Sequence, residues 1–155
     1  MNIIGIDPGL DGGLAAIGPE GLDLTVMPTA AVGKHRQLDE QAIVSWLLAH
    51  RPAHVFIEHV GARPGQGVVS MFTFGTGWGL VRGICAGMAL PYELVRPQEW
   101  QGTMLAGQPK GSEYLVASRL WPSADWRATE RAKTAASGLV DAALIAEHGR
   151  RRLGC

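Results

Sequence analysis

IIGIDPG, residues 3–9, is the stretch that decides the fold. It predicts a buried strand that ends in a carboxylate, Asp7, and is followed by turn formers. A charged carboxylate is costly to bury unless it is paired or holds a metal ion. The same combination returns twice: VFIEHV at 55–60 places Glu58 among apolar residues, and LVDAALIA at 139–146 does so for Asp141. These three acids are the first candidates for a functional site.

Outward from this strand, short apolar runs alternate with turn formers and amphipathic helical patterns. The runs predict five strands, at 2–7, 14–17, 22–27, 53–60 and 92–95. The amphipathic patterns predict helices at 38–50, 71–90, 113–120 and 138–150. Ser137 is expected to cap the last helix. Three hairpin strands followed by alternating helices and strands describe one α/β domain, residues 1–155, with a mixed five-stranded sheet flanked by helices.

Composition narrows the class of protein. The hydrophobic content of 46% and charged content of 18% are typical of a compact globule. No apolar run is expected to span a membrane and no targeting peptide is evident, so a cytoplasmic protein is expected. Cys85 and Cys155 lie too far apart in sequence to suggest a metal-ligand spacing or a disulfide framework. The formal net charge is zero, so support for nucleic-acid binding has to come from local basic residues.

The order of these elements, with acids on the first strand, the fourth strand and the last helix, resembles the RNase H-like superfamily. Local strings narrow the resemblance to RuvC-like Holliday-junction resolvases of the bacteriophage and prophage type. In chain order, the matching strings are IGIDPGLDGGLA, VFIEHV, PGQGVVSMFTFGTGWG, PYELVRPQEW and DAALIAEHGRR. The resemblance implies an endonuclease that hydrolyses phosphodiester bonds of branched DNA, foremost the four-way junction.

The resemblance also implies a two-metal site. Asp7 would bridge two Mg²⁺ or Mn²⁺ ions, Glu58 would hold one of them and Asp141 the other. Magnesium prefers oxygen ligands and keeps several waters, so three carboxylates suffice. Each acid also has a plainer interpretation: Asp7 as a turn residue, Glu58 as a salt-bridged strand end, and Asp141 as a charge favoured near a helix start.

One position departs from the family pattern. Such resolvases usually carry a fourth ligand, an acid or a histidine, three or four residues before the helix aspartate. Those positions are Gly138 and Ser137 here. The site then has three carboxylates and a weaker second metal site that favours Mn²⁺, unless another acid supplies the fourth ligand. The candidates for that acid are Asp11, Asp125 and Glu130.

DNA contacts are predicted from two local features. The loop and helix start at 61–78 carry aromatic residues that can stack on unstacked bases, with core packing as the alternative, which is favoured for Trp78. Basic residues in two later loops are expected to contact phosphates. The predicted DNA-binding residues are Arg63, Gln66, Phe72, Phe74, Lys110, Arg131 and Lys133.

Three other functions compete. An actin-like ATPase or sugar kinase shares the Asp-Pro-Gly turn, but the short chain and the missing second phosphate loop argue against it. A junction-binding module without cleavage is suggested by Ser137 and Gly138. A nuclease of flaps or forks shares every motif. Junction resolvases cut two strands symmetrically, so a homodimer is expected. The glycine-rich helix at 71–89 is a candidate interface, unless its glycines serve close packing onto the sheet.

Overall fold

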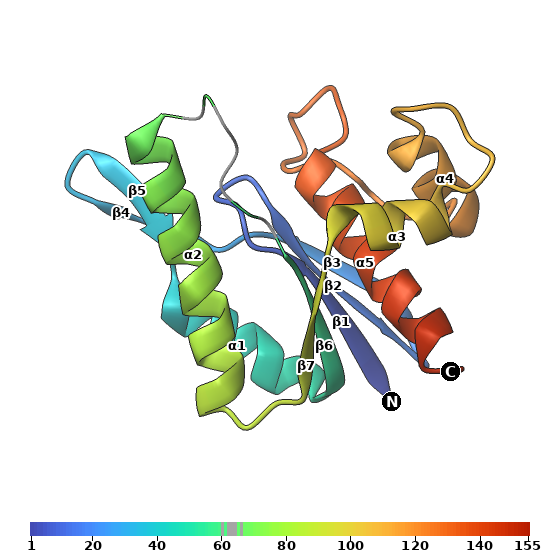
Figure 1. The fold of residues 1–155 in the computed structure, drawn as a ribbon, viewed down its shortest axis with the longest axis horizontal. Coiled ribbons are helices and arrows are strands. Elements are labelled where there is room, and N and C mark those ends of the chain that lie inside the picture. Colours follow the sequence, from blue (N-terminus) through green and yellow to red (C-terminus); the bar gives the residue numbers. More distant parts are fainter. Residues whose placement is uncertain (60, 62–64, 66) are drawn as a thin grey trace.

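A mixed five-stranded sheet forms the centre of the computed structural model, which describes all residues except 60, 62–64 and 66 (Figure 1). The strand order is β3-β2-β1-β6-β7. The first three strands form an antiparallel meander, and the last two run parallel to β1. Their bounds are β1 Asn2–Asp7, β2 Gly13–Gly18, β3 Gly21–Val26, β6 Pro52–Glu58 and β7 Tyr92–Val95.

Helices cover both faces of this sheet (Figure 1). On one face, α1 (Glu40–His50) and α2 (Val68–Gly87) enclose a core with alternate residues of β1 and β6. On the other face, α3 (Pro97–Met104), α4 (Glu113–Leu120) and α5 (Ser137–Arg152) enclose the second core. Successive strand residues point to opposite faces, so Ile4 and Ile6 enter the first core and Ile3 enters the second.

The five predicted sheet strands and four predicted helices are all present, with shifted ends. Leu38 belongs to a strand rather than to α1, which begins after Asp39; the Asp39 carboxylate accepts a hydrogen bond from the Ala42 backbone N–H at 3.0 Å. The expectation that Ser137 caps α5 is wrong: Ala136 occupies that position and Ser137 is already helical, with no side-chain capping bond. Two features were not predicted from the sequence: α3, and a hairpin of β4 (Thr29–Val32) with β5 (His35–Leu38).

Backbone contact between α5 and the sheet is unusually close. A Cβ atom added to Gly5 would lie 2.1 Å from the Ala142 carbonyl oxygen. One added to Gly13 would lie 2.7 Å from the Gly138 carbonyl oxygen, and one on Gly138 would lie 2.3 Å from the Asp11 carbonyl oxygen. Real Cβ atoms do not approach other atoms this closely, so these positions admit only glycine. The helix therefore lies directly on β1 and β2, and nearly all its residues from Gly138 to Gly149 are buried.

The helix α2 is attached much more loosely. Its buried residues are Gly77, Val81 and Cys85, and most of its remaining surface is exposed. A Cβ on any of four glycines spaced four residues apart would meet no atom within 4 Å: Gly75, Gly79, Gly83 and Gly87. The interpretation that the glycines of this helix serve packing onto the sheet therefore holds only for Gly77, where a Cβ would lie 3.2 Å from Leu38 and from the Pro8 carbonyl oxygen.

This helix also corrects the expectation that no apolar run reaches the length of a membrane span. By length and composition alone, α2 is long and apolar enough to cross a bilayer, and only 17% of the window concerned is buried. A single such helix is weak evidence for a membrane, because the core helix of a soluble protein can meet the same criterion. The helix α2 therefore combines an apolar composition with a mostly exposed surface.

Replacing Gly5 by alanine is expected to destabilise the protein by about 3 kcal/mol or more, because the methyl group would force α5 off the sheet. The control is Gly102→Ala in α3, where an added Cβ meets nothing within 4 Å and alanine should stabilise the helix by up to about 1 kcal/mol. Urea unfolding measures both free energies. Equal stabilities of Gly5→Ala and the wild type would show that α5 does not rest on β1.

Candidate active site

Two of the candidate acids end neighbouring parallel strands. In the parallel pairing of β1 with β6, Ile6 lies beside Ile57. Asp7 and Glu58 are the next residues of these two strands, so both lie at the same end of the sheet. Ile6 and Ile57 point into the core under α1 and α2. Alternation along the strands therefore turns Asp7 and Glu58 to the opposite face, which α5 covers.

The third acid comes from α5. The pKa of Asp141 is raised to about 7, first by burial and then by the negative charges of Asp7, Glu58 and Glu113. The close contact of α5 with β1 brings Asp141 within electrostatic reach of the other two predicted carboxylates. Among the described residues, no lysine or arginine forms an ion pair with Asp7 or Asp141.

Asp7 accepts a hydrogen bond within the turn that follows β1, and its carboxyl group is largely buried. Burial raises the pKa of its carboxyl group, the Gly9 backbone N–H that donates to Oδ1 at 3.1 Å lowers it, and the charge of Asp11 raises it. Asp7 is therefore a turn residue, as one of its two interpretations predicted. The turn accounts for one oxygen contact, and it does not neutralise the charge.

Glu58 is held by a residue that the sequence analysis missed. The indole Nε1–H of Trp100 donates a hydrogen bond to Glu58 Oε1 at 3.0 Å. Trp100 lies in α3 and is fully buried. The available signal was Pro97 at the helix start with Trp100 and Met104 four residues apart, which is the spacing of a short helix with one buried face.

The donor set fits a divalent cation in its chemistry. Carboxylate oxygens are the ligands that Mg²⁺ and Mn²⁺ prefer, and the raised pKa of Asp141 reflects negative charges that a cation would offset. Within residues 1–59, 61, 65 and 67–155, however, no three Asp, Glu, His or Cys side chains are gathered closely enough to hold an ion as they stand.

Ser137 stands where related resolvases usually carry a fourth metal ligand, and the structure places both Ser137 and the three acids considered as substitutes. Ser137 is exposed at the first turn of α5, four residues before Asp141. Two of the proposed substitutes are engaged elsewhere: Asp125 pairs with Arg127 at 2.7 Å, and Asp11 pairs with Arg36. Glu130, the third, lies in an exposed turn.

A further acid, Glu113, belongs to the neighbourhood of Asp141 and was not predicted. Its charge contributes to the raised pKa of Asp141. Glu113 begins α4, and Ala117, one turn later on the same face, is fully buried in the core that α5 shares. No local sequence signal marks Glu113, because its position depends on how α4 packs against α5.

Of the predicted DNA-binding aromatics, Phe74 lies beside the turn that follows Asp7. Phe72 is 76% exposed on α2. Phe74 is partly buried, and its ring lies against the turn after Asp7, since a Cβ on Gly9 would lie 3.9 Å from Phe74 Cε2. Trp78 packs against the core as predicted, stacked on His59 at 5.5 Å between ring centroids and covered by Arg82 at 4.4 Å.

The predicted basic contacts are distributed over loops. Lys110 lies between α3 and α4, while Arg131 and Lys133 precede α5. All three are exposed, and none forms an ion pair within the described part of the chain. Arg63 and Gln66 lie outside the described residues.

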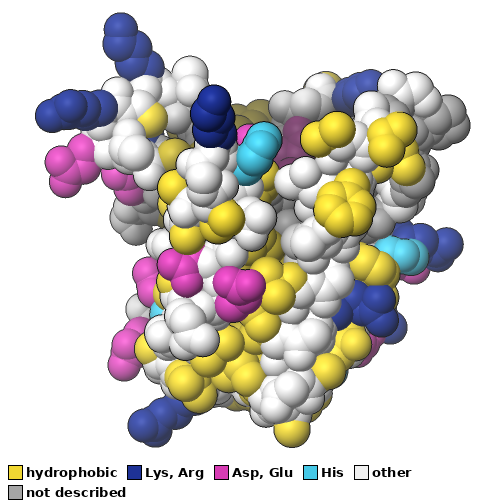
Figure 2. Space-filling model, turned by 90° about the vertical axis from the view of Figure 1, so that its left-hand side faces the viewer, with side chains coloured by type: hydrophobic (Ala, Val, Ile, Leu, Met, Phe, Trp, Pro, Cys, Tyr) yellow, Lys and Arg dark blue, Asp and Glu magenta, His cyan; other side chains and the backbone are white. Residues whose placement is uncertain are grey.

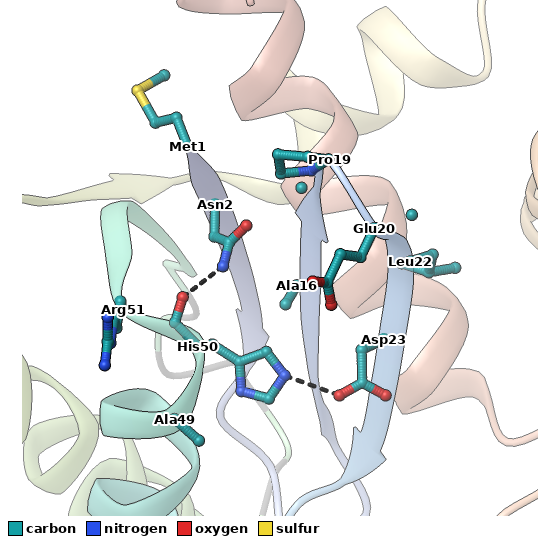
Figure 3. A pocket seen from close by; sticks show the side chains of 12 residues that line it. Met1, Asn2, Ala16, Pro19, Glu20, Leu22, Asp23, Ala49, His50 and Arg51 are labelled. Atoms are coloured by element: carbon teal, nitrogen blue, oxygen red, sulfur yellow. Dashed lines mark hydrogen bonds and ion pairs between the residues drawn. The ribbon is translucent and has the colours of Figure 1, made fainter.

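A hollow of about 700 Å³ lies at the other end of the sheet (Figure 3). Asn2 begins β1 there, and its side chain donates to the His50 carbonyl oxygen. The His50 ring contacts Asp23 at 2.7 Å. These contacts join the end of α1 to β1 and β3, and the hollow contains none of the candidate acids.

In metal-free buffer, Asp141→Asn is expected to be more stable than the wild type at pH 8, by a few kcal/mol at most, and the gain should shrink towards pH 5. The folded-state pKa of about 7 exceeds the ordinary value of 3.8, so wild-type stability falls as the pH rises between these values. Thermal unfolding in EDTA measures the difference. The control is Asp125→Asn, since Arg127 lowers the pKa of Asp125 to about 2. If the stabilities of Asp141→Asn and the wild type changed in parallel with pH, the raised pKa of Asp141 would be contradicted.

No protein-family model and no curated protein matches the chain. Among solved structures, the RuvC structure of Thermus thermophilus is similar over 99% of this chain and 97% of that one, with a TM-score of 0.64 and 20% identity. T. thermophilus RuvC in complex with Holliday junction substrate is similar over 99% and 96%, with a TM-score of 0.63 and 17% identity. The yeast mitochondrial Holliday junction resolvase Ydc2 is similar over 96% and 77%, with a TM-score of 0.64 and 15% identity. The RuvC-like fold predicted for the chain is thereby confirmed.

Proposed function

We propose that this protein is a metal-dependent endonuclease that cleaves four-way junctions and related branched DNA. The observation that carries the proposal is the coupling of Asp7, Glu58 and Asp141 on the α5-covered face, at the end of β1 and β6. The fold adds support, since two of the similar structures are Holliday junction resolvases by name or substrate, and the chain matches RuvC over nearly the full length of both.

The three carboxylates would hold the metal, with Asp7 between Glu58 and Asp141. When bound, Mg²⁺ or Mn²⁺ at such a site lowers the pKa of the attacking water and offsets charge on the phosphate oxygens. The protein supplies the ligands on rigid elements: two strand ends and a helix that lies directly on those strands. Because a carboxylate must lose its proton to bind a metal, Asp141 would bind it more weakly below pH 7.

The proposed DNA surface runs from α2 to the loops beside α5. Phe74 lies against the turn that holds Asp7, so it is the aromatic residue best placed to contact a base near the scissile phosphate. Phe72 is the most exposed aromatic of α2 and would stack on an unstacked base. The proposed phosphate contacts are Lys110, Arg131 and Lys133, with Arg63 and Gln66 remaining predictions from sequence.

A second candidate function is favoured by the serine at position 137. With Ser137 in place of an acid, and with no ready-made cluster of three ligands in the described residues, the protein could bind junctions and cleave them slowly or not at all. Flap or fork cleavage is the third candidate, because substrate choice depends on surface shape rather than on the carboxylates.

The deciding experiment is cleavage of a synthetic four-way junction, with a linear duplex and a flap as control substrates. It is run with Mg²⁺, with Mn²⁺ and with EDTA, beside Asp7→Asn. We expect paired symmetrical nicks that require metal, and a loss of at least about 10³-fold in rate for Asp7→Asn, since one ligand of the site is removed. Tight junction binding with no nicking under either metal would replace the nuclease by a binding module, and preferential flap cutting would replace the substrate.

Two symmetrical cuts require two active sites, so we also propose a homodimer that pairs through α2. Its outer face carries the four glycines at 75, 79, 83 and 87, and exposed Val68, Val69 and Phe72 near its start. The one charged side chain of α2, Arg82, lies over the Trp78 ring. Figure 2 faces this side of the molecule, where hydrophobic and uncharged side chains are interspersed with several acidic ones. Glycines one turn apart allow two helices to approach closely.

Gly79→Arg is expected to convert the dimer to a monomer, because the new side chain would stand in the centre of the α2 face. Within one subunit the substitution meets only open space, so folding should be preserved. Light scattering after gel filtration gives the mass, and Gly102→Arg on α3 is the control at an equally open position. A wild-type monomer at all concentrations, or a Gly79→Arg dimer, would exclude this interface.

A further inference from the structure

The hydrogen bond between Trp100 and Glu58 has a feature that core packing does not require. An indole N–H can only donate, and a buried one needs an acceptor. Here the acceptor is the Oε1 atom of a candidate metal ligand, at 3.0 Å. A bond from a neutral donor to a carboxylate is stronger than one between neutral groups. Trp100 therefore acts on the orientation of the Glu58 carboxylate.

The donor is also rigidly held. Pro97 begins α3, and the Arg96 backbone N–H donates to Glu99 Oε2 at 2.9 Å, closing the first turn. The Arg96 side chain bonds the other oxygen of Glu99, also at 2.9 Å. Trp100 and Met104 then enter the core beneath α5. The indole position is thus set by the fold and does not depend on a metal.

We propose that Trp100 is a positioning residue that orients Glu58 toward the metal site; the inference rests on the proposed nuclease function. Glu58 ends β6, and its side chain has three torsions, which contacts to the carboxylate restrict. The indole places one carboxylate oxygen relative to α3 and so restricts the orientation of the group. Hydrogen bonds to metal ligands from such outer residues typically change metal affinity by about 10–100-fold.

The test compares Trp100→Phe with Trp126→Phe in a Mg²⁺ titration. Trp126 is a matched control: it is buried in the same core cluster, and no hydrogen bond from its indole to an acid is present in the described residues. The chain has five tryptophans, so the Trp100 indole signal in a proton–nitrogen NMR spectrum is the one that Trp100→Phe removes. In the wild type, that signal should shift as Mg²⁺ binds.

We expect Trp100→Phe to weaken Mg²⁺ binding about 10-fold, and Trp126→Phe to change it less than 2-fold. In a Glu58→Gln background, Trp100→Phe should cause no further loss, because the carboxylate that it orients is gone. Equal weakening by the two Phe variants, or an additive loss in the Glu58→Gln background, would reduce Trp100 to a packing residue and leave the nuclease proposal intact. A wild type that neither binds Mg²⁺ nor cleaves junctions would overturn both proposals.

Discussion

The direct contact between the backbone of α5 and the backbone of β1 and β2 is the constraint on which the candidate site depends. It requires glycine at three positions, Gly5, Gly13 and Gly138, where any side chain would collide with main-chain atoms. A normally packed helix would lie about 10 Å from the sheet, and its carboxylate would then face solvent. The close contact instead brings Asp141 within electrostatic reach of Asp7 and Glu58, which the helix could not achieve through side-chain length alone.

Bringing these charges together is unfavourable for the folded state in the absence of a cation. Burial and the neighbouring acids raise the pKa of Asp141 to about 7, while burial raises that of Asp7. Polar hydrogens offset part of this cost: the Gly9 N–H donates to Asp7, and the Trp100 indole donates to Glu58. Such donors orient a carboxylate and leave it negatively charged, whereas an arginine at the same place would compete with a metal ion.

Much of the fold could be predicted from the sequence, because its central strands are short apolar runs bounded by turn formers. The elements that were missed lack that signal. The hairpin strand HRQL is mostly exposed, and α3 is only eight residues long, with a polar face around Trp100. Ser137 was assigned to the cap because of its residue type, although the chain enters the helix one residue earlier. Glu113 could not be found at all, since its approach to Asp141 arises from the packing of α4 on α5.

The end of β6 connects the two surfaces that the proposed function needs. Glu58 points to the α5 face, where Trp100 holds it. The next residue, His59, points to the opposite face as strand alternation predicts, and stacks on Trp78 of α2. The candidate metal ligand Glu58 and the α2 helix therefore lie on opposite sides of one strand end. If the proposed function holds, changes at the α2 glycines should alter assembly and leave the three carboxylates in place, because a Cβ at these glycines meets no atom of the same subunit.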